Sequence, residues 1–308
     1  MITDKTMLYL YVETPLHAGV GSGLSSIDLP IQRERTTQYP MIQGSGIKGK
    51  LRSTAEFARD QKQFSDDDIN VLFGPSVTGG GDDYAGALIA GDARILLFPV
   101  RSLSGVFAYT TSYDVLNRFR RDLEREKSGK NLDWQVPERV PDKVLVTITS
   151  DIHTNNTVVL EEFSFEVQAD KQVDAIAQWI AETALPDLGT GDYWANKIKR
   201  SLVILPDNDF RDFALYATEV ITRVRIDRTK KTVEKGALWT EEHLPTDTLL
   251  YVPIYATDAR KNGKDGSKLN GTQILEKART LGTETENYLQ LGGDETVGRG
   301  MVRIRWGS

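Results

Sequence analysis

The order of strand-like and helix-like segments constrains the fold of this chain more than any other feature. Alternating apolar and polar residues predict a strand at 7–13, and a closing strand is expected at 302–306. Helical periodicity runs from 47 to 61, where one apolar face is formed by Ile47, Leu51, Ala55 and Ala58. Because strands and helices come in runs and not in strict βαβα alternation, the sequence predicts an α+β fold.

The chain length allows one large domain or two smaller ones, since it has 308 residues. A polar stretch at 128–142, which contains Pro137 and Pro141, is where the chain could divide into two halves. Two related βαββαβ-like halves that share a surface fit the order of the predicted elements, although no clear repeat is visible. Regular alternation over 158–167 predicts one continuous strand there.

The composition excludes several classes of protein. Cysteine is absent, which rules out disulfides and thiolate-bound zinc and fits a reducing compartment. No apolar stretch approaches the roughly 20 residues that a membrane-spanning helix needs. The N-terminal residues show no basic region followed by a long apolar core, so we expect no secretory signal and a cytoplasmic protein.

Charge is spread unevenly along the chain. A net charge of −6 argues against a protein that coats nucleic acid over its whole surface. Basic residues instead gather in segments 17–52, 222–236 and 299–308, as Arg33, Arg35, Lys48, Lys50 and Arg52, then Arg223, Arg225, Arg228, Lys230, Lys231 and Lys235, then Arg299, Arg303 and Arg305. Such patches suit a subunit that grips nucleic acid at defined places, although any one patch alone is as typical of a solvated surface.

The segment Gly44–Lys50 (GSGIKGK) matches the first seven positions of the phosphate-binding loop G-x-x-x-x-G-K-[ST]. The eighth position is Leu51, so the hydroxyl that holds Mg²⁺ on a nucleoside triphosphate is missing, and nucleotide hydrolysis is disfavoured. Glycines followed by a helix N-terminus still suit a phosphate group. Lys48 and Arg52 share one helical face and could hold successive phosphates of a polynucleotide; a glycine turn before a solvent-facing basic helix is the alternative.

Several segments taken together resemble one protein family. They are 16–19 (LHAG) with Gly21, 27–34 (IDLPIQRE), 44–52 (GSGIKGKLR), 72–75 (LFGP), 92–94 (DAR), 98–102 (FPVRS) and 292–300 (GGDETVGRG). This combination resembles the RAMP superfamily of CRISPR proteins, and within it the repeated backbone subunit of the type III-B effector, the Cmr complex. The resemblance runs from residue 7 to the end of the chain.

The resemblance implies a single RAMP domain with an RRM-like (ferredoxin-like) core, inserted loops and a thumb-like β-hairpin. It also implies partners: a CRISPR guide RNA, a complementary target RNA, further copies of the chain stacked head to tail in a filament, and other Cmr subunits, with no membrane. Each thumb would displace a base pair at regular intervals. The basic segment 222–253, between predicted strands at 222–226 and 249–254, is the candidate thumb, and an ordinary exposed hairpin is the alternative.

The resemblance further implies an endoribonuclease that cuts target RNA in a metal-dependent reaction, leaving a 5′-hydroxyl and a 2′,3′-cyclic phosphate. Asp28 matches the family's essential aspartate. For this chemistry the ribose 2′-hydroxyl attacks its own phosphorus, and a carboxylate could bind hydrated Mg²⁺ or Mn²⁺ or take the hydroxyl proton. One carboxylate is a weak metal site, so phosphate oxygens and waters would complete the shell. The alternative is an aspartate that merely begins a turn before Leu29 and Pro30.

Other site residues also come from the resemblance. His17 could act as an acid or base at the same phosphate, or be a plain loop histidine. Glu241 and His243 fall where residues that assist cleavage are expected, but other members often carry an aromatic hydroxyl in place of His243. RNA backbone contacts are expected from Gly44, Ser45, Lys48, Lys50 and Arg52, and near the C-terminus from Gly292, Gly293, Thr296 and Arg299.

Three other functions remain open from the sequence. The first is a non-catalytic scaffold that binds guide RNA while cutting happens elsewhere, and the presence of Asp28 in its motif disfavours it. The second is a stand-alone nuclease that trims precursor guide RNA, which would want a self-sufficient acid–base set; the chain has only three histidines, including His153 in a turn without basic neighbours. A nucleotide hydrolase comes last, because Leu51 stands where a hydroxyl is needed.

Overall fold

The computed structural model describes residues 1–21, 27–60, 64–75, 84–125, 132–261 and 268–307. The strands are β1 (Ile2–Val12), β2 (Met41–Ile42), β3 (Leu88–Ala90), β4 (Ala93–Arg101), β5 (Phe107–Ser112), β6 (Lys143–Val146), β7 (Thr157–Leu160), β8 (Phe163–Ala169), β9 (Leu202–Leu205), β10 (Glu219–Ile226), β11 (Val233–His243), β12 (Leu249–Thr257), β13 (Tyr288–Gln290) and β14 (Met301–Trp306). The helices are α1 (Gly44–Asp60), α2 (Asp66–Phe73), α3 (Tyr113–Glu124), α4 (Lys171–Trp179) with the π-turn Ile180–Ala184, α5 (Tyr193–Ser201), α6 (Asp207–Tyr216), α7 (Gly271–Glu284) and the 3-10 turn Glu295–Val297.

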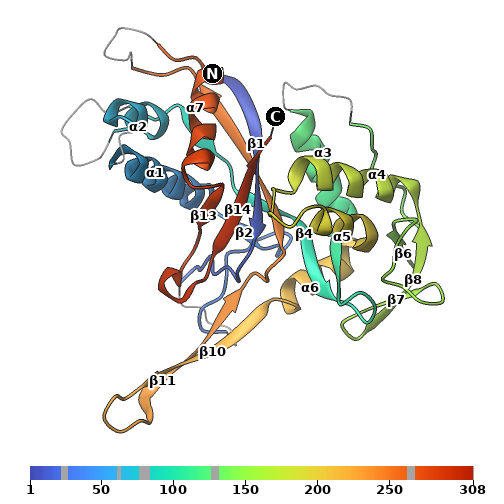
Figure 1. Cartoon of the computed structure of the whole chain (residues 1–308). Coiled ribbons are helices and arrows are strands. Elements are labelled where there is room, and N and C mark those ends of the chain that lie inside the picture. Colours follow the sequence, from blue (N-terminus) through green and yellow to red (C-terminus); the bar gives the residue numbers. More distant parts are fainter. Residues whose placement is uncertain (22–26, 61–63, 76–83, 126–131, 262–267, 308) are drawn as a thin grey trace.

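One mixed sheet organises the molecule, so the predicted α+β class is confirmed. Its strands lie in the order β13-β14-β1-β12-β4-β5-β9-β6-β8-β7, with β2 on β4 and β3 on β12 (Figure 1). Four of these strands and two helices, with other elements inserted between them, come in the chain order β1, α1, β4, β12, α7 and β14. That succession is a βαββαβ unit, and its strands lie side by side as β14-β1-β12-β4 with antiparallel neighbours.

Helices cover this sheet in two groups, visible on either side of β1 in Figure 1. Helices α1, α2 and α7 pack together near β1, β3 and β12, whereas α3 to α6 pack against the half formed by β4, β5, β6 and β9. The apolar face of α1 predicted from the sequence is confirmed, because Ile47, Leu51, Ala55 and Ala58 are all buried. No helix in the described ranges has the length and apolar character that a membrane span requires.

Two features of the chain differ from the sequence prediction. The expected single strand at 158–167 is wrong: the chain turns at Glu161, which has a left-handed backbone (φ 50°), and β7 and β8 form an antiparallel hairpin. Helices α2 and α6 were not predicted from the sequence. The glycine-rich run at 78–83 (TGGGDD), whose composition predicts a turn, lies outside the described residues.

A separate two-stranded hairpin, β10–β11, projects from the body of the molecule (Figure 1). It occupies 219–243, whereas residues 249–253 of the expected thumb segment belong to β12 in the main sheet. Its two strands pair from Glu219 with His243 at the base to Ile226 with Val233 near the tip. The hairpin leaves a row of apolar side chains exposed, namely Val220, Val224, Ile226, Val233 and Leu238.

A polar cluster lies at the edge of the apolar core. The Tyr11 hydroxyl donates a 2.5 Å hydrogen bond to Asp247 Oδ1 and lies 3.0 Å from the Tyr109 hydroxyl. Burial raises the pKa of Asp247 above its ordinary value, and the nearby Lys197 opposes that shift. Folding therefore favours the protonated carboxyl, so the contribution of Asp247 to stability is greatest at low pH and is lost as pH rises through its folded pKa.

We predict that Asp247→Asn removes the part of the loss of folding stability with rising pH that comes from Asp247. Asparagine keeps the oxygen that accepts from Tyr11 and tolerates the left-handed backbone at this position (φ 72°). Urea unfolding between about pH 4 and 7 should show the variant gaining stability relative to the wild type as pH rises. Asp133→Asn, at an exposed position, is the matched control. If the stability of Asp247→Asn relative to the wild type fell with rising pH, the assignment would be contradicted.

Candidate functional site

The base of the hairpin is paired with the loop that follows β1, defined here as residues 16–31, of which 22–26 lie outside the description. Leu16 and Leu244 exchange two backbone hydrogen bonds, of 3.0 and 2.8 Å. Further along, the Leu29 amide donates to the Thr240 carbonyl, and the Glu242 amide donates to the Leu29 carbonyl, each at 3.0 Å. Strand β11 and Leu244, which directly follows it, therefore hold both ends of the loop that carries His17 and Asp28.

Asp28 is attached to β11 through Thr240. Its Oδ2 accepts hydrogen bonds from the Thr240 amide at 2.8 Å and the Thr240 hydroxyl at 2.9 Å, and that hydroxyl also accepts from the Asp28 amide. These hydrogen bonds to the ionised carboxylate, the backbone one foremost, lower the pKa of Asp28. The side chain is exposed, so a fixed negative charge faces solvent.

His17 is attached to the same strand two residues further on. Its Nδ1 lies 2.7 Å from the Glu242 carbonyl oxygen, which can only accept, so Nδ1 carries the proton. In the neutral ring Nε2 is then the unprotonated nitrogen. A Cβ on Gly19 would lie 2.5 Å from this Nε2, so glycine at position 19 leaves the space that the ring occupies.

The glycine-rich segment near the C-terminus packs on His17. The Gly293 amide donates to the His17 carbonyl at 2.9 Å. Gly292 has φ 78°, and a Cβ there would come within 2.2 Å of the same carbonyl oxygen. These two glycines therefore permit a close approach of two backbones, a role within the protein that is separate from the predicted contact with RNA. Thr296 is exposed, and Arg299 is half-buried and lies close enough to His243 to lower its pKa.

Glu242, which the sequence did not single out, joins the hairpin base to neighbouring segments through its side chain. Its side chain accepts from Arg33 at 2.5 Å, from the Thr218 hydroxyl at 2.9 Å and from the Ile31 amide at 3.0 Å. Arg33 also donates to the carbonyls of Gln38 and Ala214. The side chains of this pair are only 13% and 3% exposed, so Arg33 is a structural residue and is removed from the basic surface expected at 17–52.

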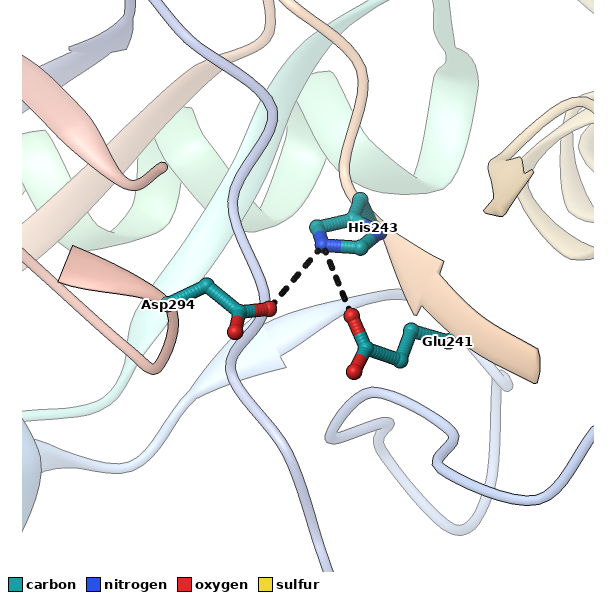
Figure 2. Close-up of side chains that lie close together, drawn as sticks. All are labelled: Glu241, His243 and Asp294. Atoms are coloured by element: carbon teal, nitrogen blue, oxygen red, sulfur yellow. Dashed lines mark ion pairs between the residues drawn. The ribbon is translucent and has the colours of Figure 1, made fainter. Parts of the chain in front are cut away.

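On the other side of β11, Glu241 and His243 face Asp294 from the glycine-rich segment (Figure 2). His243 Nε2 lies 3.6 Å from Asp294 Oδ2 and 4.0 Å from Glu241 Oε2. Arg223 on β10 also approaches both carboxylates, at 3.2 Å from Glu241 and 3.6 Å from Asp294. Burial, and then the charges of His17 and Arg299, lower the pKa of His243, which keeps its ring neutral at physiological pH.

The basic residues of α1 that were predicted to bind RNA do not lie at the base of the hairpin. Lys48 is half-buried, and its pKa is lowered by burial and by the neighbouring charges of Arg260 and Arg52. Arg52 is held by Glu56 at 2.9 Å and by the Gly74 carbonyl. Lys50 is half-buried and Ser45 is exposed.

Gly44 has a packing role of its own. A Cβ there would come within 2.5 Å of the Ala90 carbonyl, and its amide donates to Asp92 at the start of the helix. Asp92 therefore already uses part of the helix N-terminus that the sequence suggested for a phosphate.

The structure thus brings together one subset of the predicted residues. His17, Glu241, His243, Gly292, Gly293 and Arg299 surround the base of the hairpin, and Asp28 joins them through Thr240. Among the described residues, no hydrogen bond or ion pair links the α1 cations to this group. Sequence reasoning missed Thr240, Glu242, Arg223 and Asp294 as site residues, although Asp294 stands in the glycine-rich motif.

Comparisons with known proteins agree with this architecture. The RAMP superfamily model matches residues 9–303, and the chain belongs to that superfamily. The CRISPR system Cmr endoribonuclease Cmr4 of Pyrococcus furiosus is 40% identical over 96% of this chain and 93% of its own length. The CRISPR system CMR subunit Cmr4 of Saccharolobus solfataricus is 26% identical over 96% of this chain and 95% of its own length. A crystal structure of oligomeric Cmr4 from P. furiosus superposes with a TM-score of 0.72 at 34% identity, covering 99% of this chain and 98% of that one.

We predict that Thr240→Val raises the pKa of Asp28 toward its ordinary value. The substitution keeps the side-chain shape and the backbone amide but removes the hydroxyl that donates to the carboxylate. An NMR titration of the Asp28 carboxyl carbon should show ionisation at higher pH than in the wild type. Thr240→Ser retains the hydroxyl and should titrate like the wild type, whereas an unchanged Asp28 titration in Thr240→Val would contradict the assigned contact.

Proposed function

We propose that this chain is the RNA-binding backbone subunit of a CRISPR type III-B effector complex and that it cleaves target RNA paired with the guide. The observation that carries the proposal is the 40% identity, over nearly the whole chain, to a relative named as a Cmr endoribonuclease. The attachment of Asp28 and His17 to neighbouring positions of β11 supports it. We treat the chain as one RAMP domain, with 219–243 as the thumb hairpin.

The two loop residues suit different tasks. Asp28 has a lowered pKa, so it is a weak proton acceptor and a persistent negative charge. His17 has an unprotonated Nε2 when its ring is neutral, because Nδ1 donates to the Glu242 carbonyl. We therefore assign the removal of the 2′-hydroxyl proton to His17, and an electrostatic or metal-holding role to Asp28. Their points of attachment are two residues apart on β11, roughly 7 Å along the strand.

The proposed reaction is an internal displacement at phosphorus. His17 Nε2 takes the 2′ proton, the 2′-oxygen forms a bond to phosphorus, and the bond from phosphorus to the 5′-oxygen breaks. The leaving 5′-oxygen takes a proton from water, which gives a 2′,3′-cyclic phosphate and a 5′-hydroxyl. Thr240 holds Asp28, and Gly19 leaves room for the His17 ring.

A divalent cation fits Asp28 only with help from the RNA. Oδ2 already accepts two hydrogen bonds from Thr240, so the exposed carboxylate offers mainly Oδ1. One carboxylate oxygen suits Mg²⁺ or Mn²⁺ as part of a shell that phosphate oxygens and water complete. Such an ion would neutralise charge that develops on the phosphate during the displacement.

The remaining predicted residues would hold RNA backbone. Lys48 and Arg52 of α1 form a cationic cluster with Arg260, which follows β12, and Lys50 and Ser45 also lie on α1. Thr296 and Arg299 would contribute from the glycine-rich segment. The exposed apolar row on the hairpin suits contact with unstacked bases, as a thumb requires. The partners would be guide RNA, target RNA, further copies in a filament and other Cmr subunits, in the cytoplasm.

A non-catalytic scaffold is the second candidate. The α1 cations are joined by no described hydrogen bond or ion pair to Asp28, so RNA binding and cleavage can be lost separately. A scaffold would need the α1 cations and not Asp28. Substitution of Asp28 therefore distinguishes a scaffold from a nuclease.

We predict that Asp28→Ala, in the assembled complex, abolishes target cleavage and leaves guide and target binding intact. Loss of a charged group at the reacting phosphate should slow cutting by at least about 100-fold. Complementary RNA should give regularly spaced products with the wild type, and none with the variant or with EDTA. Asp133→Ala, at an exposed aspartate far along the chain, is the matched control.

A single 2′-deoxy substitution in the target sharpens that test. Without the 2′-oxygen no cyclic phosphate can form, so cutting should stop at that nucleotide and continue at the others. Cleavage that survives Asp28→Ala would support the scaffold, with a nuclease elsewhere in the complex.

We also predict that Gly19→Ala slows cleavage by roughly 10- to 100-fold without weakening RNA binding, because displacement of a catalytic group by about 1 Å is that costly. A Cβ at position 19 would come 2.5 Å from His17 Nε2, so the ring must move. Single-turnover rates of reconstituted complexes provide the measurement. Gly49→Ala is the control, because a Cβ there meets nothing within 4 Å, and equal rates for the two variants would remove His17 from the mechanism.

A further inference from the structure

His243 is a buried polar side chain whose environment calls for an explanation. Its ring is 0% exposed, and neither Nδ1 nor Nε2 has a hydrogen-bond partner among the described residues. Buried imidazoles ordinarily satisfy at least one nitrogen, so an unpartnered one points to a missing ligand, water or ion.

The ring is directed at two carboxylates. Figure 2 shows Nε2 facing both Asp294 and Glu241, at 3.6 and 4.0 Å, which is longer than a hydrogen bond. One ligand atom from each of the three residues lies within 4.8 Å of the other two. A metal ion sits about 2.0–2.2 Å from nitrogen and oxygen ligands, so modest inward rotation of the side chains would close the set around one ion.

We propose that Glu241, His243 and Asp294 form a binding site for one divalent transition-metal ion of the Mn²⁺, Co²⁺ or Zn²⁺ class. An imidazole nitrogen with two carboxylate oxygens is a donor set that these ions accept, whereas Mg²⁺ and Ca²⁺ prefer oxygen alone. The two carboxylates match the double charge of the ion. Partial burial keeps competing water away from the site.

A neighbouring side chain already orients one ligand. The Trp239 indole donates to Glu241 Oε1 at 2.7 Å, which leaves Oε2 as the oxygen nearest His243. Hydrogen bonds of this kind, from a second layer of residues to a ligating carboxylate, are typical of metal sites and increase their affinity. Trp239, Glu241 and His243 alternate along β11 and so share one face of the strand.

Arg223 competes with the proposed ion. Its guanidinium lies 3.2 Å from Glu241 Oε2 and 3.6 Å from Asp294 Oδ2, the two oxygens that face His243. In the metal-free protein it supplies positive charge to the acids. Because its side chain is 29% exposed, it can turn toward solvent when an ion enters. Removal of Arg223 should therefore strengthen metal binding, which a purely structural ion-pair network would not predict.

This site uses other ligands than the proposed oxygen-only site at Asp28, although the His243 ring lies 5.4 Å from that of His17. Binding can be measured on the full-length chain without RNA, so failure of the metal site and failure of the proposed function are distinguishable.

The test uses tag-free, EDTA-stripped protein titrated with Co²⁺, followed by visible absorption and by calorimetry. We expect one bound ion per chain. His243→Gln and Asp294→Asn should each weaken binding on the order of 100-fold. His153→Gln, at a histidine on a distant turn, is the matched control and should bind like the wild type, and Arg223→Gln should bind about tenfold tighter.

Far-UV circular dichroism and thermal unfolding establish that each variant is folded. If His243→Gln does not fold, Asp294→Asn decides, because asparagine tolerates the left-handed backbone of Asp294 (φ 62°). The proposal is overturned if the wild type binds no Co²⁺, or if a folded His243→Gln or Asp294→Asn binds it as tightly as the wild type.

Discussion

The pairing of the loop after β1 with strand β11 is the interaction on which the site depends. Two backbone hydrogen bonds at Leu29 and two at Leu16 clamp the loop at both ends. Without them Asp28 would be an exposed aspartate on a long loop, and a loop of that kind has no fixed geometry for catalysis. With them, Asp28 and His17 are held by the strand that also carries Glu241 and His243, and the His17 ring lies 5.4 Å from that of His243.

The buried pair of Arg33 and Glu242 keeps that strand and loop together. Glu242 receives Arg33, Thr218 and the Ile31 amide, so one carboxylate joins the hairpin base to two separate segments. Loss of one partner from a buried pair costs about 3–5 kcal/mol, largely because the other charge is left unpaired. Because desolvation offsets much of the attraction within an intact buried pair, its main effect here is to fix the position of the loop against the hairpin base.

Much of the fold was readable from periodicity, and most of the site was not. The strand at the N-terminus, helix α1 and the closing strand carry strong apolar patterns and lie where expected. The hairpin turn at Glu161 was missed because the alternation of β7 continues into β8, and α6 was missed because its polar residues hide the buried Phe210 and Phe213. The start of α2 was readable in principle, since Ser65 and Asp68 form a capping box. Arg223, Glu242 and Asp294 join the site through pairing between distant segments, and no local pattern reports that.

Amide hydrogen exchange of the wild-type protein would show directly whether β11 holds the loop after β1. The amides of Leu29, Ile31 and Glu242 donate to Thr240, Glu242 and Leu29 respectively, all at 3.0 Å. We expect these amides to exchange slowly and to a similar degree, whereas the amide of the exposed Thr296 exchanges fast. Exchange of Leu29 and Ile31 at the rate of an unprotected chain, with β11 still protected, would contradict this expectation, because the loop would then not be held by the hairpin.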